Sequence, residues 1–221
     1  MKFDTEIELV NVLKSTLNEC FPRQDINIFQ EVSLGYGIAD LVICVRDDKF
    51  CDKSFHLSRA ILDKCDINIY YLIDRKPKIT LLEIIEITRT SKMKIFDSLK
   101  KLVNSEYIDC IDGCYVISRS YEFSFNMNFA IEAKLKDWKR ALKQAYRYKW
   151  FAEFAFVVLD EHNSSSALKN LLYFEKYNVG LATINRNGVL KRLHNPKRDV
   201  PFDKKMQMLF SEKFIFSSAI C

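Results

Sequence analysis

Two stretches of this chain place acidic and lysine side chains where strands are expected. Asp40 lies in residues 35–43 (GYGIADLVI), and Glu132 and Lys134 lie in residues 129–135 (FAIEAKL). Side chains alternate along a strand, so Glu132 and Lys134 project from one face. Charged groups at the ends of core strands are costly unless they are paired or bind a metal. Clustered oxygen ligands suit Mg²⁺ or Mn²⁺, and a lysine beside them can hold and help deprotonate a water. This combination predicts metal-assisted phosphodiester hydrolysis.

The order of these residues resembles the motif of the PD-(D/E)xK nucleases, the family of restriction endonucleases and RecB-type exonucleases. Asp40 comes first and Glu132-Ala133-Lys134 follows, although Ala39 stands where the motif usually has proline. The resemblance implies an α/β fold with a restriction-endonuclease-like mixed sheet flanked by helices. It also implies metal ligands from Asp40, Glu132 and the carbonyl of Ala133, with Lys134 assisting the reaction.

A second motif follows on the next expected helix, residues 136–151. Gln144-Ala145-Tyr146-Arg147-Tyr148 resembles the Gln-x-x-x-Tyr motif of the RecB-like branch. Gln144 and Tyr148 are four residues apart and share one helical face. Their expected role is to support the metal site or to contact the DNA backbone. The resemblance as a whole extends over residues 1–50 and 125–195.

Further acids could complete the site. Glu6 and Glu8 lie on an expected amphipathic helix over residues 4–20, and positions two apart on a helix point in different directions. Glu6 is the predicted site residue, while an acid in a first helical turn is also favoured by the helix dipole alone. Glu31, on the first expected strand, is either a water-mediated ligand or an acid facing solvent.

The helix after Lys134 is strongly basic. Its positive residues are Lys136, Lys139, Arg140, Lys143 and Arg147. Beside a phosphodiester site they favour binding of DNA phosphates, and Tyr148 is predicted to join them. The alternative is a solvated face balanced by Asp137 and Glu153. Trp138 is predicted to be a core residue or a dimer contact rather than a platform on which bases stack.

Composition sets the broad class. The chain has 221 residues, 48% of them hydrophobic, which is enough for a sizeable core. The net charge of +5 is compatible with a nucleic-acid partner but does not require one. No phosphate-binding glycine loop is present, so ATPase activity is not expected. The seven cysteines show no Cys-x-x-Cys pair and indicate buried, reduced thiols in a cytoplasmic protein. The first residues are not typical of a signal peptide, and no apolar run predicts a membrane span.

The expected elements alternate in the manner of an α/β domain. Strands are predicted at 26–33, 38–46, 129–135, 153–160, 179–185 and 189–193, with helices at 4–20, 136–151 and 165–177. The apolar tail after Pro196 is expected to pack as a final helix or to meet a partner subunit.

An insertion separates Asp40 from Glu132. Helices are predicted at 57–73, 80–87 and 91–103, followed by a hairpin that turns at Asp112-Gly113. Three helices and a hairpin resemble a winged helix-turn-helix, giving an inserted domain at 55–122 and a nuclease-like core at 1–54 and 123–221. Arg89, Ser91, Lys92 and Lys94 begin the predicted recognition helix and are the expected DNA contacts. The apolar residues predicted to form its core are Ile95, Phe96, Leu99 and Leu102.

The sequence therefore predicts a Mg²⁺- or Mn²⁺-dependent nuclease that acts on DNA, with duplex DNA as the favoured substrate. An endonuclease in defence against foreign DNA or in DNA repair fits the resemblance, and cleavage of both strands would favour a homodimer. The rival hypothesis is a non-catalytic DNA-binding or regulatory protein on a nuclease-like scaffold. A third is an interaction module that docks through its winged helix.

Overall fold

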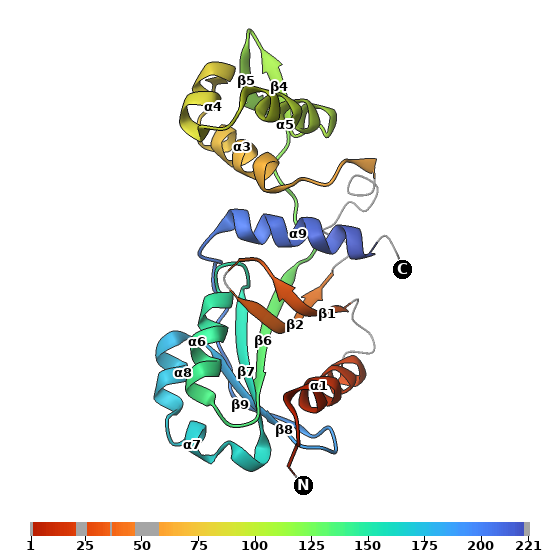
Figure 1. The fold of residues 1–221 in the computed structure, drawn as a ribbon, viewed down its shortest axis with the longest axis vertical. Helices are drawn as coiled ribbons and strands as arrows, with labels where there is room; N and C mark the ends of the chain where they lie inside the picture. Colours follow the sequence, from red (N-terminus) through yellow and green to blue (C-terminus); the bar gives the residue numbers. More distant parts are fainter. Residues whose placement is uncertain (1, 21–25, 36, 47–57, 219–221) are drawn as a thin grey trace. The chain divides into compact units, whose positions relative to one another are not determined.

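The computed structural model describes residues 2–20, 26–35, 37–46 and 58–218 of the chain, which forms two compact units (Figure 1). Unit 1 comprises Met1–Asp47 and Phe125–Lys204, and unit 2 comprises Asp48–Ser124 and Lys205–Cys221. The chain thus leaves unit 1 after the second strand, builds most of unit 2, and returns to unit 1 before Glu132.

Unit 1 is built on one mixed sheet with the strand order β1-β2-β6-β7-β8-β9. The strands β6, β7 and β8 run parallel, and the other neighbours are antiparallel. Their bounds are β1 Ile26–Ser33, β2 Ile38–Val45, β6 Met127–Lys134, β7 Phe154–Asp160, β8 Gly180–Ile184 and β9 Leu190–His194. The predicted α/β class, with a mixed sheet flanked by helices, is confirmed.

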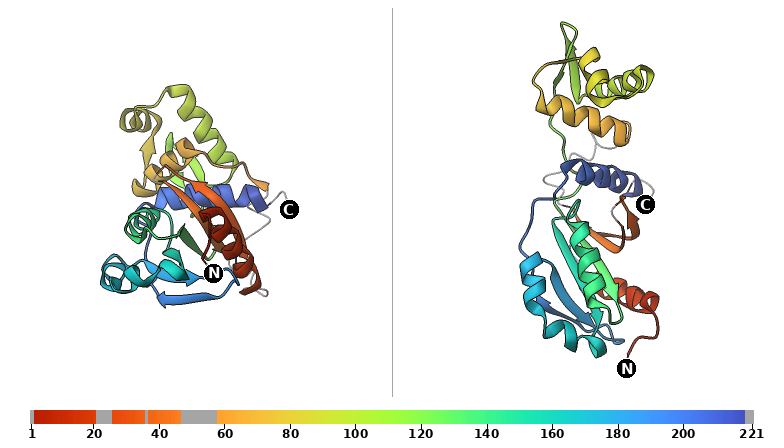
Figure 2. Two further views of the ribbon diagram at one scale, coloured as in Figure 1. Left: turned by 60° about the horizontal axis from the view of Figure 1, so that its bottom comes forward. Right: turned by 60° about the vertical axis from the view of Figure 1, so that its left-hand side comes forward.

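Helices cover both faces of this sheet, with α1 opposite α6 and α8 (Figure 2). The first helix, α1 (Glu6–Cys20), presents Leu9, Leu13 and Leu17 to a core formed by odd-numbered strand residues such as Leu41 and Ile131. The Thr5 hydroxyl accepts a hydrogen bond from Glu8 N at 3.2 Å and caps the helix. Even-numbered residues of β2 and β6 therefore face the α6 side.

The helices on the α6 side follow β6 and β7. Helix α6 spans Trp138–Tyr148, and a short 3₁₀ turn occupies Glu161–Asn163. The predicted single helix over 165–177 is wrong, because two helices occupy this stretch, α7 (Ser165–Leu168) and α8 (Leu171–Tyr177).

Unit 2 contains four helices and a small sheet within its described residues. The order of its sheet is β3-β5-β4. The bounds are α3 Lys64–Arg75, β3 Ile79–Thr80, α4 Leu81–Thr88, α5 Lys92–Asn104, β4 Ile108–Ile111, β5 Cys114–Ile117 and α9 Lys204–Ser218. Asp112 and Gly113 have φ angles of 51° and 75°, and two successive positive φ angles match the tight hairpin turn that was predicted.

Two details of unit 2 correct the predictions. The predicted helix over 57–73 is shorter within the described residues, because residues 59–63 are not helical and α3 begins at Lys64, where Asp63 forms a capping box with Asp66. Residue 57 itself lies outside the described residues. Phe96 is 57% exposed and is not a core residue, whereas Ile95, Leu99 and Leu102 are buried. Ser91 occupies the N-cap of α5, but its side chain makes no capping hydrogen bond.

The C-terminal helix corrects the predicted domain boundary. The predicted core included residues 205–221, yet α9 packs within unit 2. Glu212 is buried and accepts hydrogen bonds from Arg59 at 2.7 and 2.8 Å, from Leu62 N at 2.8 Å and from the Tyr121 hydroxyl at 2.6 Å. A buried carboxylate with this many donors ties α9 to the inserted segment.

The described cysteines Cys44, Cys65, Cys110 and Cys114 are free thiols. Cys44 is buried, as expected, but Cys110 is exposed on the hairpin, so the prediction of buried thiols is wrong for it. Cys20, Cys51 and Cys221 have side chains outside the described part. No helix within the described residues is long and apolar enough to cross a membrane.

Candidate active site

Asp40 and Glu132 lie beside each other on the neighbouring strands β2 and β6. Leu41 pairs with Ile131, so Asp40 and Glu132 occupy the next position of the same antiparallel register. Both residues are even-numbered and lie on the α6 face. The Asp40 carboxylate accepts a hydrogen bond from Ala133 N at 2.7 Å, which holds it against the end of β6.

The Lys134 ammonium is the point on which the oxygens of this site converge. Its Nζ lies 2.9 Å from Glu132 Oε1, 3.9 Å from Asp40 Oδ2 and 3.2 Å from the carbonyl oxygen of Ala133. Glu6 approaches the same ammonium at 3.1 Å from the start of α1. The single positive charge of Lys134 therefore lies within 4 Å of three carboxylates and one carbonyl oxygen.

Glu132 is 1% exposed and is held by Tyr148 of α6. The Tyr148 hydroxyl contacts Glu132 Oε2 closely and lies 2.6 Å from the carbonyl oxygen of Ile38. Burial raises the pKa of Glu132 above its ordinary value, although hydrogen bonds from Tyr148 and Lys134 oppose the shift. Burial and the adjacent Glu132 carboxylate likewise raise the pKa of Tyr148. The tyrosine therefore remains a hydroxyl donor at neutral pH.

For Asp40 and Lys134, burial and the neighbouring groups shift the pKa in opposite directions. Burial raises the pKa of Asp40, and the hydrogen bond from Ala133 N and the charge of Lys134 only partly offset this. Burial lowers the pKa of Lys134, but its hydrogen bond to Glu132 and the negative charges around it outweigh burial, and the net shift is upward. Lys134 is therefore positively charged at neutral pH and donates hydrogen bonds, so in this state it cannot accept a proton from water.

The structure separates the two acids at the start of α1. Glu6 turns to Lys134, whereas Glu8 pairs with Arg186 at 2.9 Å. Glu31 is exposed and lies in register opposite Asp40, between the pairs Gln30–Leu41 and Val32–Ala39. Its φ angle of 51° is left-handed, and such strain in a residue other than glycine is common at functional sites.

The donor set suits a hard divalent cation. Two carboxylates and one main-chain carbonyl converge on Lys134, and their oxygens are the ligand type that Mg²⁺ and Mn²⁺ prefer. Within the described residues, no group of three or more His, Cys, Asp or Glu side chains is arranged to hold a metal. A divalent ion at this position would instead be held by two carboxylates and one main-chain oxygen, those of Asp40, Glu132 and Ala133, which all contact the Lys134 ammonium.

The two residues of the second motif, Gln144 and Tyr148, have different surroundings. Tyr148 is buried and contacts Glu132, so its predicted contact with DNA is wrong and its predicted support of the acidic site is the role that the structure favours. Gln144 instead lines a hollow of about 230 Å³ together with Arg140, Lys143 and Arg147. In the described part of the chain, the buried Gln144 Oε1 has no hydrogen-bond partner. The hollow therefore offers three cations and an amide to a ligand.

The basic face of α6 is not neutralised by the acids that could have balanced it. Asp137 caps the helix by accepting a hydrogen bond from Arg140 N at 3.1 Å, and Glu153 pairs with Arg198 at 2.7 Å. The five basic residues are all exposed, namely Lys136, Lys139, Arg140, Lys143 and Arg147. This charge distribution favours phosphate binding over a balanced, solvated face.

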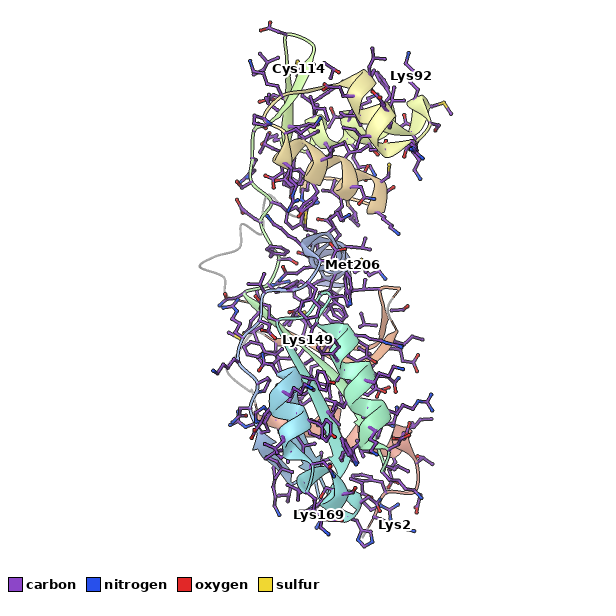
Figure 3. The ribbon with its side chains drawn as sticks, turned by 90° about the vertical axis from the view of Figure 1, so that its left-hand side faces the viewer. Lys2, Lys92, Cys114, Lys149, Lys169 and Met206 are labelled. Carbon is purple, nitrogen blue, oxygen red and sulfur yellow. The ribbon has the colours of Figure 1, made fainter. Side chains whose placement is uncertain are left out.

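Unit 2 presents its predicted DNA contacts to solvent. Arg89, Ser91, Lys92 and Lys94 are exposed at the end of α4 and the start of α5, and Lys92 projects from the surface in Figure 3. Met93 and Phe96 are exposed beside them. This surface combines positive charge with apolar contact area.

Sequence reasoning missed two features near the site, the left-handed backbone at Glu31 and an aromatic cleft between α6 and α8. The spacing of Tyr173 and Tyr177, four residues apart, was the available signal for the cleft. No protein-family model matches the chain, and neither a curated protein nor a solved structure matches it.

Proposed function

We propose that this protein is a metal-dependent nuclease of the PD-(D/E)xK type that hydrolyses DNA. The observation that carries the proposal is the convergence of Asp40, Glu132 and the Ala133 carbonyl on Lys134. A nuclease-like scaffold without activity has no need of two carboxylates with raised pKa values, because their burial is unfavourable.

The residues of the site divide the work of hydrolysis. A bound Mg²⁺ or Mn²⁺ supplies Lewis-acid stabilisation of the phosphoryl charge and a lower pKa for water. The Lys134 ammonium orients the attacking water and stabilises negative charge that develops on the phosphate oxygens. Tyr148 holds Glu132 in place through its hydroxyl, and Glu6 holds Lys134 from α1. Tyr148 and Glu6 are thus positioning residues.

Two surfaces are proposed to bind the DNA. The basic residues of α6 would contact phosphates next to the scissile bond. Unit 2 would act as an inserted winged helix, with Arg89, Ser91, Lys92 and Lys94 at the start of its recognition helix. The predicted endonuclease action belongs to this proposal, with defence against foreign DNA or DNA repair as its setting.

The test is cleavage of supercoiled plasmid and of linear single- and double-stranded DNA with Mg²⁺, Mn²⁺ or EDTA. Lys134→Ala and Asp40→Asn should each lower the cleavage rate by about 10²–10³-fold or more, because each removes charge at the reacting centre. Lys169→Ala is the matched control, since Lys169 is an exposed lysine of unit 1 outside the site (Figure 3). It should cleave at the wild-type rate.

Two results would contradict the proposal. Cleavage that persists in both site variants would come from another site or a contaminant. If folded wild type with added metal binds these DNAs in a salt-sensitive manner without cutting them, the protein is the non-catalytic DNA-binding alternative.

A further inference from the structure

A second concave surface lies on unit 1, in a cleft of about 540 Å³ between α6 and α8. Its aromatic lining consists of Trp138 and Tyr146 from α6 and of Tyr173 and Tyr177 from α8. The volume falls within the range of small-ligand sites.

The aromatic rings of this cleft are held in position by their neighbours; Trp138 is buried at its base, and the three tyrosines remain accessible. Trp138 donates a hydrogen bond from Nε1 to Ser166 Oγ at 3.2 Å, and its ring lies 6.0 Å from that of Tyr173. Tyr146 and Tyr177 form an edge-to-face pair with centroids 5.4 Å apart. The three tyrosines are 38–50% exposed. Rings that are oriented by neighbours but not covered by them can stack on a planar ligand without a large ordering cost.

Positive charge connects this cleft to the basic hollow on α6. Lys139 and Lys143 line the cleft, and Lys143 also lines the hollow with Arg140 and Arg147. At about 100° per residue, the basic row lies between the side of α6 that carries Tyr148 and the side that carries Tyr146. A strand of phosphates running around α6 would therefore pass from the candidate active site to the aromatic cleft.

We infer that the cleft binds unpaired bases of single-stranded DNA, so that the substrate of the proposed nuclease carries a single-stranded segment. The inference rests on the proposed function for the link to cleavage, while the binding step stands on the cleft alone. In a duplex the faces of the bases are covered by their neighbours, whereas an unpaired base can stack between aromatic side chains. The lysines select a polyanion over an apolar peptide.

The experiment measures binding in EDTA, where metal-dependent cleavage cannot occur. Fluorescence anisotropy compares a labelled oligothymidylate with an abasic oligonucleotide of the same length, which keeps the phosphates and lacks the bases. The variants are Tyr173→Ala and Tyr146→Ala. The control is Leu172→Ala, because Leu172 is an exposed neighbour of Tyr173 on α8 that does not line the cleft. Melting temperatures verify that each variant is folded.

The expected result is that wild type and Leu172→Ala bind the oligothymidylate about tenfold more tightly than the abasic strand, the size of one stacked base. Each tyrosine variant should lose most of this preference and keep its affinity for the abasic strand. Three results overturn the inference. Wild type binds both strands equally, wild type binds neither strand, or a tyrosine variant lowers the affinity for both strands by the same factor. A base preference in a protein that cleaves neither plasmid nor linear single- or double-stranded DNA would refute the nuclease and retain the cleft. Cleavage without a base preference would retain the nuclease and refute the cleft.

Discussion

Removing the Tyr148 hydroxyl isolates the interaction that holds Glu132 in the candidate site. In Tyr148→Phe, the ring and its packing remain, but Glu132 Oε2 loses the donor that it contacts in the wild type. A hydrogen bond to a charged group contributes about 1.5–3 kcal/mol, so we expect a loss of about 2 kcal/mol at neutral pH. The melting temperature should fall by about 6 °C.

The pH dependence of this loss distinguishes a charged hydrogen bond from simple packing. The hydroxyl stabilises ionised Glu132, so its contribution is largest above the raised pKa of that carboxylate. Below that pKa, protonated Glu132 can donate to the Tyr148 oxygen while the hydroxyl donates to the Ile38 carbonyl, 2.6 Å away. The cost of Tyr148→Phe should then shrink to about 1 kcal/mol, as for a bond between neutral groups.

The assay is urea unfolding in EDTA at several pH values, arranged as a double-mutant cycle with Glu132→Gln. In the Glu132→Gln background, Tyr148→Phe should cost about 1 kcal/mol or less and show no pH dependence. An equal loss in both backgrounds, or a loss in the wild type that does not change with pH, would refute the assignment of Tyr148 as the support of an ionised Glu132.

Three further perturbations test other parts of the structure. Asp40→Asn should raise the melting temperature in EDTA, because the raised pKa of Asp40 means that its ionisation destabilises the folded state. The difference in melting temperature between variant and wild type should grow as the pH rises above the ordinary carboxyl pKa of 3.8. A difference that shrinks over that range contradicts this prediction. Gly180→Ala should lower the free energy of unfolding by about 1–3 kcal/mol, since its Cβ would lie 2.2 Å from the Phe156 ring; urea unfolding with no change would show that Phe156 yields freely. Glu212→Ala should destabilise unit 2 by about 3–5 kcal/mol, because Arg59 loses its buried partner. Backbone amides of unit 2 should then exchange hydrogen faster. Unaltered protection of these amides from exchange would contradict the role of α9.

The elements of this protein were predictable because they depend on local patterns. Apolar spacing identified α1 and α6, alternation and turn residues identified the strands, and Asp112-Gly113 identified the hairpin. The shared face of Glu132 and Lys134 follows from strand geometry alone. The α/β class follows in turn from the order of the elements.

Other features depended on neighbours that are distant in the sequence. The contact between the Glu132 carboxylate and Tyr148 depends on the packing of α6 across β2 and β6, which buries Tyr148. Phe96 fits the periodicity of a core residue, but its side chain is exposed in the described part of unit 2. The apolar tail was predicted to form a final helix or to meet a partner subunit, and buried contacts such as that between Arg59 and Glu212 place α9 in unit 2.

The sequence by itself therefore determined most of the elements, the α/β class and the candidate residues of the site, because periodicity and residue type are local properties. The tertiary structure alone decided which acids meet Lys134, which tyrosine is buried and where the aromatic cleft lies. Those outcomes depend on burial and on contacts between segments far apart in the chain, which local sequence patterns do not specify.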